Sequence, residues 1–193
     1  MSARQKRGLL MVILGLSMAF TALWLHNTQE EQDVLAGQNS QVLLRRLEMP
    51  GIPAIMPEQT VTAMAEKEYQ GYTMIGILRI AALEMELPVL STWSEDWLQV
   101  APCRYSGSLY TEDLILMGHN YKSHFTPLHK IVAGTGVEFE DVNGIIHRYL
   151  VEKTEILHGS DVEKLPSDFP LTLFTCTAGG QNRLIVRCTA DNN

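Results

Sequence analysis

The sequence is short of positive charge and of cysteine, and each shortage limits what the protein can be. Its 193 residues carry 15 lysines and arginines against 22 acidic residues, a formal net charge of -7. A nucleic-acid-binding protein needs a basic surface that displaces counterions from phosphates, so this balance argues against that class. Only three cysteines are present. At most two of them can pair, so at least one thiol stays free and needs another explanation.

Charge is also missing from a long apolar run near the N-terminus, residues 8–25. A helix of this length spans roughly 27 Å, close to the hydrocarbon core of a bilayer. Three basic residues precede the run within 4–7, and three acidic residues follow it within 30–33. The positive-inside rule therefore predicts a cytoplasmic tip and single-pass anchor over 1–27, with the remainder of the chain outside the cytoplasm. The alternative, a cleaved secretory signal, gives the same location for that remainder.

Residues 28–70 are rich in glutamine and glutamate and contain no functional motif, so we interpret them as an extracytoplasmic stalk. A short helix is predicted over 34–47, and a second over 60–69. Pro50 and Pro53 separate the two, because proline lacks a backbone donor and restricts the residue before it. The simplest function for this segment is that of a spacer.

From residue 71 onward the chain consists of short strand-like runs between turn signals, which predicts a mainly β domain over 71–193. The strongest hairpin signal is Asn143-Gly144, since both residues tolerate positive φ. Many short strands at this spacing favour a closed or nearly closed barrel. A short helix is expected within 91–100, and a loop with a helical turn within 121–132. The predicted strands cover residues 73–83, 85–90, 113–119, 136–141, 146–157, 171–176 and 183–188.

Three residues at the ends of these runs could form a catalytic site. Cys176 closes one strand, where a thiol can be exposed yet held still, although a buried structural cysteine is the commoner case. His119 closes another strand and could supply the base that a cysteine nucleophile needs. Arg183 opens the strand after Cys176, and its guanidinium could hold an oxyanion. Arg187 is its rival, but four residues along a strand is about 13 Å, so both cannot serve one thiol.

These residues carry a resemblance to a known family. The run of residues 172–176, TLFTC, is similar to the T-L-x-T-C signature of sortases, and Gly118-His119-Asn120 resembles the sortase histidine site. Arg183 before an aliphatic run resembles the sortase arginine, and the order histidine, cysteine, arginine is the family's order. The resemblance covers about residues 72–189. It implies an eight-stranded sortase-type barrel with short helices, preceded by one transmembrane helix.

The resemblance also implies a reaction. Cys176 would attack a sorting signal similar to Leu-Pro-x-Thr-Gly and form a thioacyl enzyme, with His119 moving protons and Arg183 stabilising the oxyanion. The partners would be secreted proteins that carry a C-terminal sorting signal, and a cell-wall peptide or pilin amine as acceptor. The loop from Cys176 to Arg183 is short and no Asp-Pro-aromatic lid is present, which leaves the subclass open. A secreted Cys/His cell-wall peptidase and a membrane-tethered β binding module are the alternatives.

Two further features carry less weight. Cys103 and Cys188 could pair outside the cytoplasm, but we favour two unpaired, hydrophobically packed thiols. His119, His124 and His129 recur every five residues, which matches no metal-ligand spacing, so no metal site is expected. Some sortases bind calcium, and the acidic strand around Glu138 and Asp141 could do so, but a solvated strand edge is the favoured interpretation. We therefore expect no cofactor.

Overall fold

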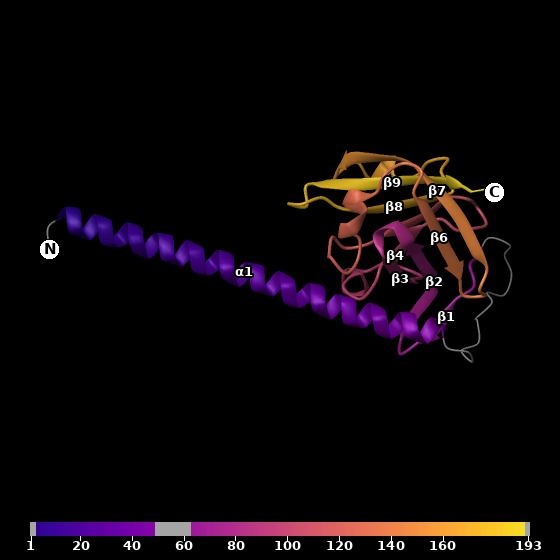
Figure 1. The fold of residues 1–193 in the computed structure, drawn as a ribbon, viewed down its shortest axis with the longest axis horizontal. Coiled ribbons are helices and arrows are strands. Elements are labelled where there is room, and N and C mark those ends of the chain that lie inside the picture. Colours follow the sequence, from indigo (N-terminus) through magenta and orange to yellow (C-terminus); the bar gives the residue numbers. More distant parts are fainter. Residues whose placement is uncertain (1–2, 49–62, 192–193) are drawn as a thin grey trace.

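The computed structural model describes residues 3–48 and 63–191, and consists of a long helix that runs into a β-barrel (Figure 1). The helix is α1 (Ala3–Glu48). Four short helical segments interrupt the strands: η1 (Ala81–Leu83), α2 (Glu95–Leu98), η2 (Thr126–Lys130) and η3 (Val162–Lys164). The strands are β1 (Lys67–Tyr69), β2 (Tyr72–Ile80), β3 (Met85–Leu90), β4 (Cys103–Ser106), β5 (Leu114–Met117), β6 (Gly136–Asp141), β7 (Ile146–His158), β8 (Leu171–Cys176) and β9 (Asn182–Ala190).

Eight of the described strands close into a barrel, as predicted. Their order is β2-β3-β4-β5-β8-β9-β7-β6, and β6 pairs back onto β2 to complete the circle. The neighbours are antiparallel except for two parallel pairs, β3 with β4 and β5 with β8. Closure leaves no free edge among these eight strands, which removes the hazard of edge-to-edge pairing.

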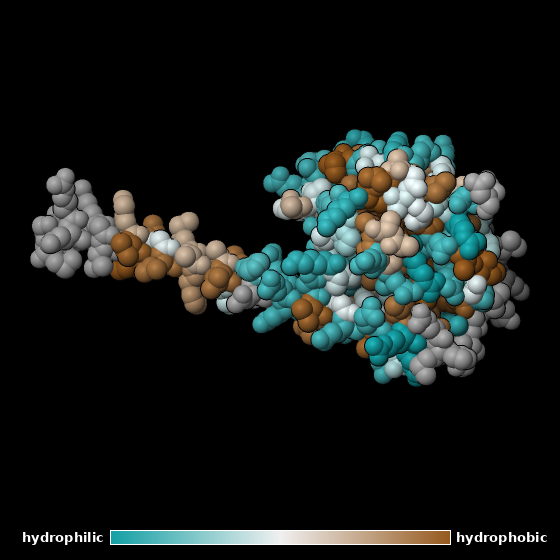
Figure 2. All heavy atoms as spheres, in the orientation of Figure 1, coloured by the Kyte–Doolittle hydropathy of each residue, from teal (hydrophilic) through white to brown (hydrophobic). Residues whose placement is uncertain are grey.

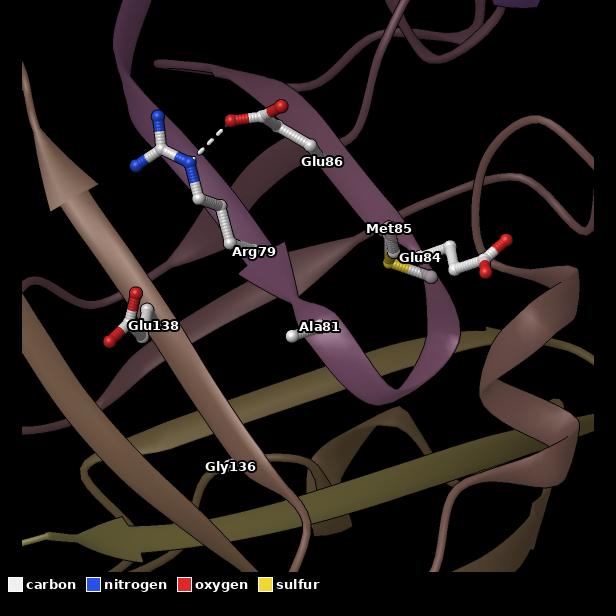
Figure 3. Close-up of a pocket in the computed structure, with 7 residues that line it drawn as sticks. All are labelled: Arg79, Ala81, Glu84, Met85, Glu86, Gly136 and Glu138. Atoms are coloured by element: carbon white, nitrogen blue, oxygen red, sulfur yellow. Dashed lines mark hydrogen bonds and ion pairs between the residues drawn. The ribbon is translucent and has the colours of Figure 1, made fainter.

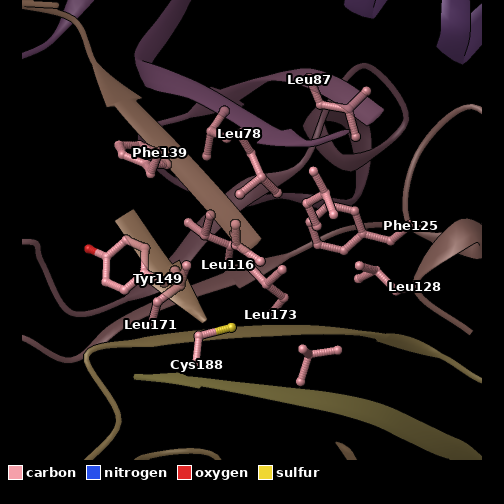
Figure 4. Packing of buried hydrophobic residues seen from close by; sticks show 14 of the residues in the cluster. Leu78, Leu87, Leu116, Phe125, Leu128, Phe139, Tyr149, Leu171, Leu173 and Cys188 are labelled. Atoms are coloured by element: carbon pink, nitrogen blue, oxygen red, sulfur yellow. The ribbon is translucent and has the colours of Figure 1, made fainter. Parts of the chain in front are cut away.

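The barrel interior is filled by aliphatic and aromatic side chains from alternate positions of each strand (Figure 4). On β8, for example, Leu171 and Leu173 point into this core, whereas Phe174 belongs to a second apolar cluster on the outer face. This alternation follows from the period of two in a β-strand. It also fixes which face carries Cys176, because residues 172, 174 and 176 share one side.

Most of the predicted strands and turns are confirmed, with one omission and one error. The Asn143-Gly144 turn joins β6 to β7, with Gly144 at φ 83°. The sequence reading missed β4, which is only four residues long. It also assigned a helix to 60–69, but Lys67–Tyr69 is a strand that pairs with β2 through a tight turn at Gln70 and Gly71, both at positive φ. Residues 60–62 lie outside the described part of the chain.

Helix α1 is continuous, so the predicted anchor and the short helix over 34–47 are one element. It is long and apolar enough, by length and composition, to cross a membrane, and the side chains of residues 11–26 are exposed. Figure 2 shows this part projecting from the domain as a mostly hydrophobic rod. The helix thus has one half without protein contacts and one half that packs on the barrel.

The docked half of α1 is held by a stripe of small and aliphatic residues at helical spacing. Ala36, Ser40, Leu43, Leu44 and Leu47 are all buried, and the three leucines join an apolar cluster with strand residues of the barrel. Their spacing of three and four places them on one face. The helical part of the proposed stalk is therefore not a free spacer. The predicted break at Pro50 and Pro53 lies outside the described residues.

A polar contact anchors the same face. Ser40 Oγ donates to the carbonyl oxygen of Val100 at 2.5 Å and lies 3.0 Å from Nε2 of His124, which is only 1% exposed. Burial lowers the pKa of His124 to about 4, and the charge of His119 acts in the same direction. The imidazole is therefore neutral in the folded protein at neutral pH.

Acid should weaken the fold through this histidine. In the unfolded chain His124 titrates near 6.5, so below that pH the unfolded state binds the proton first and stability falls until about pH 4. Full charging corresponds to roughly 3 kcal/mol in the free energy of unfolding. Urea denaturation at pH 7 and pH 4.5 tests this, with His124→Gln as the variant that cannot titrate. If both proteins lose the same stability between the two pH values, His124 is not the group responsible.

Candidate functional site

Strand register brings the three predicted site residues onto one row of the barrel. In the parallel β5–β8 pair, Met117 lies opposite Phe174. His119 and Cys176 each follow two residues later, and the contact continues beyond the last pair because Gly118 N donates to Phe174 O at 3.1 Å. Residues opposite one another on neighbouring strands have Cα atoms about 5 Å apart.

The arginine joins this row from the other side of the cysteine. In the antiparallel β8–β9 pair, Cys176 lies directly opposite Arg183. The strands β8 and β9 therefore present a cysteine and an arginine at paired positions, and His119 follows two residues after the end of the neighbouring β5. The β8–β9 pair is a local hairpin, whereas the β5–β8 pair joins distant segments, so this long-range pairing is what brings the histidine segment to the cysteine.

Cys176 is the accessible thiol among the three cysteines, all of which are unpaired. Its side chain is partly exposed at the end of β8, while Cys103 and Cys188 are both fully buried. Burial raises the pKa of each of these two thiols to about 12. They behave as small hydrophobic side chains, as predicted, and Cys176 is the one with access to a substrate.

Packing orients the segment that carries His119. A side chain at Gly118 would come within 2.6 Å of the Phe125 ring, so only glycine allows this loop to fold back on itself. Phe125 N donates to the His119 carbonyl at 3.1 Å and closes the turn. The His119 ring lies against Tyr121 at 4.7 Å between centroids, and Tyr121 lies 5.5 Å from His124. The histidine is thus supported by a stack of rings that ends at α1.

The electrostatics of His119 favour a neutral imidazole. Burial lowers its pKa, and the carboxylate of Glu95 on α2 partly opposes this effect. A neutral imidazole next to a thiol can accept its proton, and a nearby carboxylate stabilises the imidazolium that results. Burial and the charges of Asp33 and Glu95 also raise the pKa of Tyr121, so that ring stays uncharged at neutral pH.

A second apolar cluster packs on the outer face of β5, β8 and β9. It consists of the buried residues Ile115, Leu165, Phe174 and Ile185. The Tyr105 ring meets the Phe174 ring edge-on at 5.3 Å, and beside Tyr105 and Ser106 lies a hollow of about 470 Å³. This cluster fixes the strand that carries Cys176 from the outer side of the barrel.

The comparisons with known proteins agree with this geometry. A family profile described as "Sortase domain" matches residues 78–191, more than half of the chain. The chain belongs to the sortase family. No curated protein sequence matches it.

Solved sortase structures have the same fold. Streptococcus agalactiae sortase C1, in complex with MTSET, is 25% identical, with a TM-score of 0.55 over 61% of this chain and 69% of that one. Clostridium perfringens sortase C, solved with a C-terminal cell wall sorting motif, is 20% identical, with a TM-score of 0.55 over 62% and 71%. Listeria monocytogenes sortase A is 16% identical, with a TM-score of 0.56 over 62% and 88%. The subclass is not resolved.

Arg187, which the sequence offered as an alternative to Arg183, is buried in the domain and fully engaged in hydrogen bonds. Arg187 is 3% exposed, and its guanidinium donates to Glu155 Oε1 at 2.8 Å, to Leu165 O at 2.5 Å and to Thr172 Oγ1 at 3.1 Å. The connection between β7 and β8 folds over Arg187, so this rival of Arg183 holds the fold together. Arg183, by contrast, bonds to the neighbouring loop, with Nη1 donating to Gly180 O at 2.8 Å and to Asn182 O at 3.2 Å.

The acidic strand considered for calcium is occupied by protein contacts. Glu138 pairs with Arg148, Glu140 pairs with Arg79, and Asp141 Oδ1 accepts from the backbone of Asn143. A hollow of about 500 Å³ lies beside Arg79 and Glu138, where Arg79 also bonds Glu86 (Figure 3). Within residues 3–48 and 63–191, no group of three metal-ligating side chains gathers at one point. The expectation of no cofactor stays a prediction.

The sequence reading missed the groups that support His119. Glu95, Tyr121 and His124 come from α2 and from the loop after β5, and no local pattern relates them to the histidine. The contact made by α1 could have been predicted in part, because Ala36 and Ser40 lie on one face of the helix with the buried leucines. That stripe predicts a buried face, although not the partner that covers it.

Replacing Arg187 and replacing Arg183 should have different effects on the free energy of unfolding. Arg187→Ala leaves buried acceptors unpaired and should reduce the free energy of unfolding by about 3 kcal/mol. Arg183→Ala removes bonds to exposed loop carbonyls and should cost less than about 1 kcal/mol. Urea denaturation of the two variants at pH 7 measures the difference. Equal losses of stability would contradict the structural assignment of Arg187.

Proposed function

We propose that this sortase-family protein is a membrane-anchored cysteine transpeptidase. It cleaves an LPXTG-like sorting signal through a thioacyl enzyme and transfers the protein to an amine of the cell wall. The observation that carries the proposal is the row of His119, Cys176 and Arg183 across three neighbouring strands, in a domain of a cysteine transpeptidase family.

In the first step the Cys176 thiolate attacks the carbonyl carbon before the scissile bond. The carbon–sulfur bond forms, negative charge moves to the carbonyl oxygen, and the Arg183 guanidinium stabilises it. When the carbon–nitrogen bond breaks, the leaving amine takes a proton from the His119 imidazolium. The products are a thioacyl enzyme and a neutral amine.

In the second step an acceptor amine attacks the thioester carbon. His119, now neutral, takes the proton from the attacking nitrogen, the new amide bond forms and the thiolate of Cys176 leaves. The lowered pKa of His119 suits this base role, while Glu95 helps the imidazolium form in time for the next cycle. How thiol and imidazole share the proton at rest is a property of the coupled pair.

The family of the domain supports a sorting signal as the substrate. The Clostridium perfringens sortase C structure includes a cell wall sorting motif, which supports the same ligand class here. The partners are then secreted proteins that bear such a C-terminal signal.

The location follows from α1. We propose that residues 8–25 cross the membrane with the N-terminus in the cytoplasm, which puts the barrel on the outer surface. The division into a tip and anchor at 1–27, a stalk at 28–70 and a catalytic domain at 71–193 stays a prediction. The packing of Ser40 and the leucines of α1 supports keeping the stalk helix with the domain in any experiment.

The direct test is mass spectrometry of the full chain in detergent micelles with Leu-Pro-x-Thr-Gly peptides and triglycine. We expect an acyl adduct on Cys176 and a transferred product. Cys176→Ala should abolish both, and His119→Ala should lower the rate of product formation by at least about a hundredfold.

Two outcomes would contradict the proposal. Cleavage that never yields a triglycine product would indicate a Cys/His peptidase. A folded protein that forms no adduct with any of the peptides, although a thiol reagent labels Cys176, would favour the binding module.

A further inference from the structure

The side chain of His119 is oriented by packing rather than by a hydrogen bond. Among residues 3–48 and 63–191, no group hydrogen-bonds to its imidazole, whereas the Tyr121 ring lies 4.7 Å away between centroids and is tilted by 33°. Rings at this separation attract each other beyond the effect of the area they bury. A group that exchanges protons with a neighbouring thiol needs a fixed orientation. The position of Tyr121 therefore sets where the imidazole of His119 points.

Tyr121 is itself fixed by the ring and the backbone of His124. The two rings lie 5.5 Å apart between centroids and are tilted by 52°. The carbonyl oxygen of Tyr121 accepts hydrogen bonds from the backbone N–H groups of His124 and Thr126, both at 3.0 Å. This segment is therefore one tight turn. A shift of His124 is passed to Tyr121 and from there to His119.

His124 is held in turn by Ser40 of α1. The Ser40 hydroxyl has a single proton and donates it to Val100 O at 2.5 Å, so its oxygen accepts from Nε2 of His124, 3.0 Å away. This arrangement places the proton of the neutral imidazole on Nε2. The other ring nitrogen, Nδ1, is buried and has no hydrogen-bond partner among the described residues. Ser40 is therefore the side chain that sets the orientation of the His124 ring.

A second contact fixes α1 against the same turn. Asp33 Oδ1 accepts hydrogen bonds from Ser123 N at 2.9 Å and from Ser123 Oγ at 2.7 Å. An added Cβ at Gly37 would lie 3.0 Å from Ser123 Cβ, so a small residue suits this close approach of the helix. Asp33, Gly37 and Ser40 are spaced by four and three residues, which places them on one face of α1. The turn that carries Tyr121 is thus held at two points of the helix.

The rest of the docked half of α1 keeps the helix in place without help from Ser40. Leu43, Leu44 and Leu47 are buried in an apolar cluster with strand residues of the barrel. Three leucines bury much more apolar surface than one serine, so they supply most of the adhesion between helix and barrel. Removing the hydroxyl of Ser40 should therefore leave α1 docked while it releases the ring of His124.

We propose that Ser40 is a positioning residue for His119, and that the docked half of α1 is part of the active-site structure as well as a connection to the proposed anchor. Ser40 acts through His124 and Tyr121 rather than on the reacting atoms. The inference rests on the proposed function, since it takes His119 as the group that activates Cys176. It follows that the barrel needs its own N-terminal helix for full activity.

The test is the rate at which iodoacetamide labels Cys176 at pH 7, in the full chain in micelles and without substrate. Ser40→Ala should slow this labelling about fivefold, because a misplaced imidazole activates the thiol less well. In a protein that already carries His119→Ala, adding Ser40→Ala should cause no further slowing. Val137→Ala is the control for lost stability. It opens a cavity in the barrel core on β6, which pairs with neither β5 nor β8, and should leave the labelling rate unchanged.

Tyr121 offers a matched pair of variants in the middle of the ring stack. Tyr121→Phe keeps the ring and loses only the hydroxyl, so labelling should stay within about twofold of the wild-type rate. Tyr121→Leu removes the ring contact with His119 and should slow labelling at least as much as Ser40→Ala does. In the transfer reaction, Ser40→Ala and Tyr121→Leu should lower kcat and leave the KM for the sorting peptide unchanged.

Three results would overturn the inference. The first is labelling of Ser40→Ala at the wild-type rate. The second is an equal loss of rate from Ser40→Ala in proteins with and without His119, since the effect would then not pass through the imidazole. The third is a loss in Tyr121→Phe as large as that in Tyr121→Leu. A His119→Ala protein that labels as fast as the wild type would instead refute the role of His119 in the proposed function itself.

Discussion

The parallel contact between β5 and β8 is the constraint on which the site depends. These strands are separated by more than fifty residues of chain, yet Met117 lies opposite Phe174, and this register sets His119 level with Cys176. A slip of one residue would turn the whole strand over and bury the wrong face. The register is held by the core, because Leu116 and Leu173 point inward on the same row. The positions of the site residues and of the core are therefore fixed by the same pairing.

A second constraint comes from outside the barrel. The ring stack of His119, Tyr121 and His124 ends on Ser40 of α1, and Asp33 holds the same loop through Ser123. The element that we propose as a membrane anchor thus contacts the loop that carries His119. The orientation of the histidine and the acid sensitivity of the docking contact both follow from this packing.

The local sequence predicted much of the fold, and the non-local packing explains what it missed. Alternating apolar runs predicted seven strands, and the Asn143-Gly144 turn predicted a hairpin. The strand β4 is too short to show an alternating apolar pattern. Lys67–Tyr69 was predicted as part of a helix because the local sequence does not reveal its pairing with β2. Cys176, His119 and Arg183 were predicted because each lies at the end of a strand-like run in a family motif. The burial of Arg187 and the support from Glu95 and α1 depend on segments far away in sequence.

The central claim is that the barrel places His119 where it activates Cys176. Alkylation by iodoacetamide tests this without a substrate, since only the thiolate reacts. At pH 7, mass spectrometry of the folded full chain should find Cys176 labelled, with the buried Cys103 and Cys188 intact. His119→Ala should slow this labelling by about tenfold or more. Labelling of Cys176 at the same rate with and without the imidazole would contradict the account.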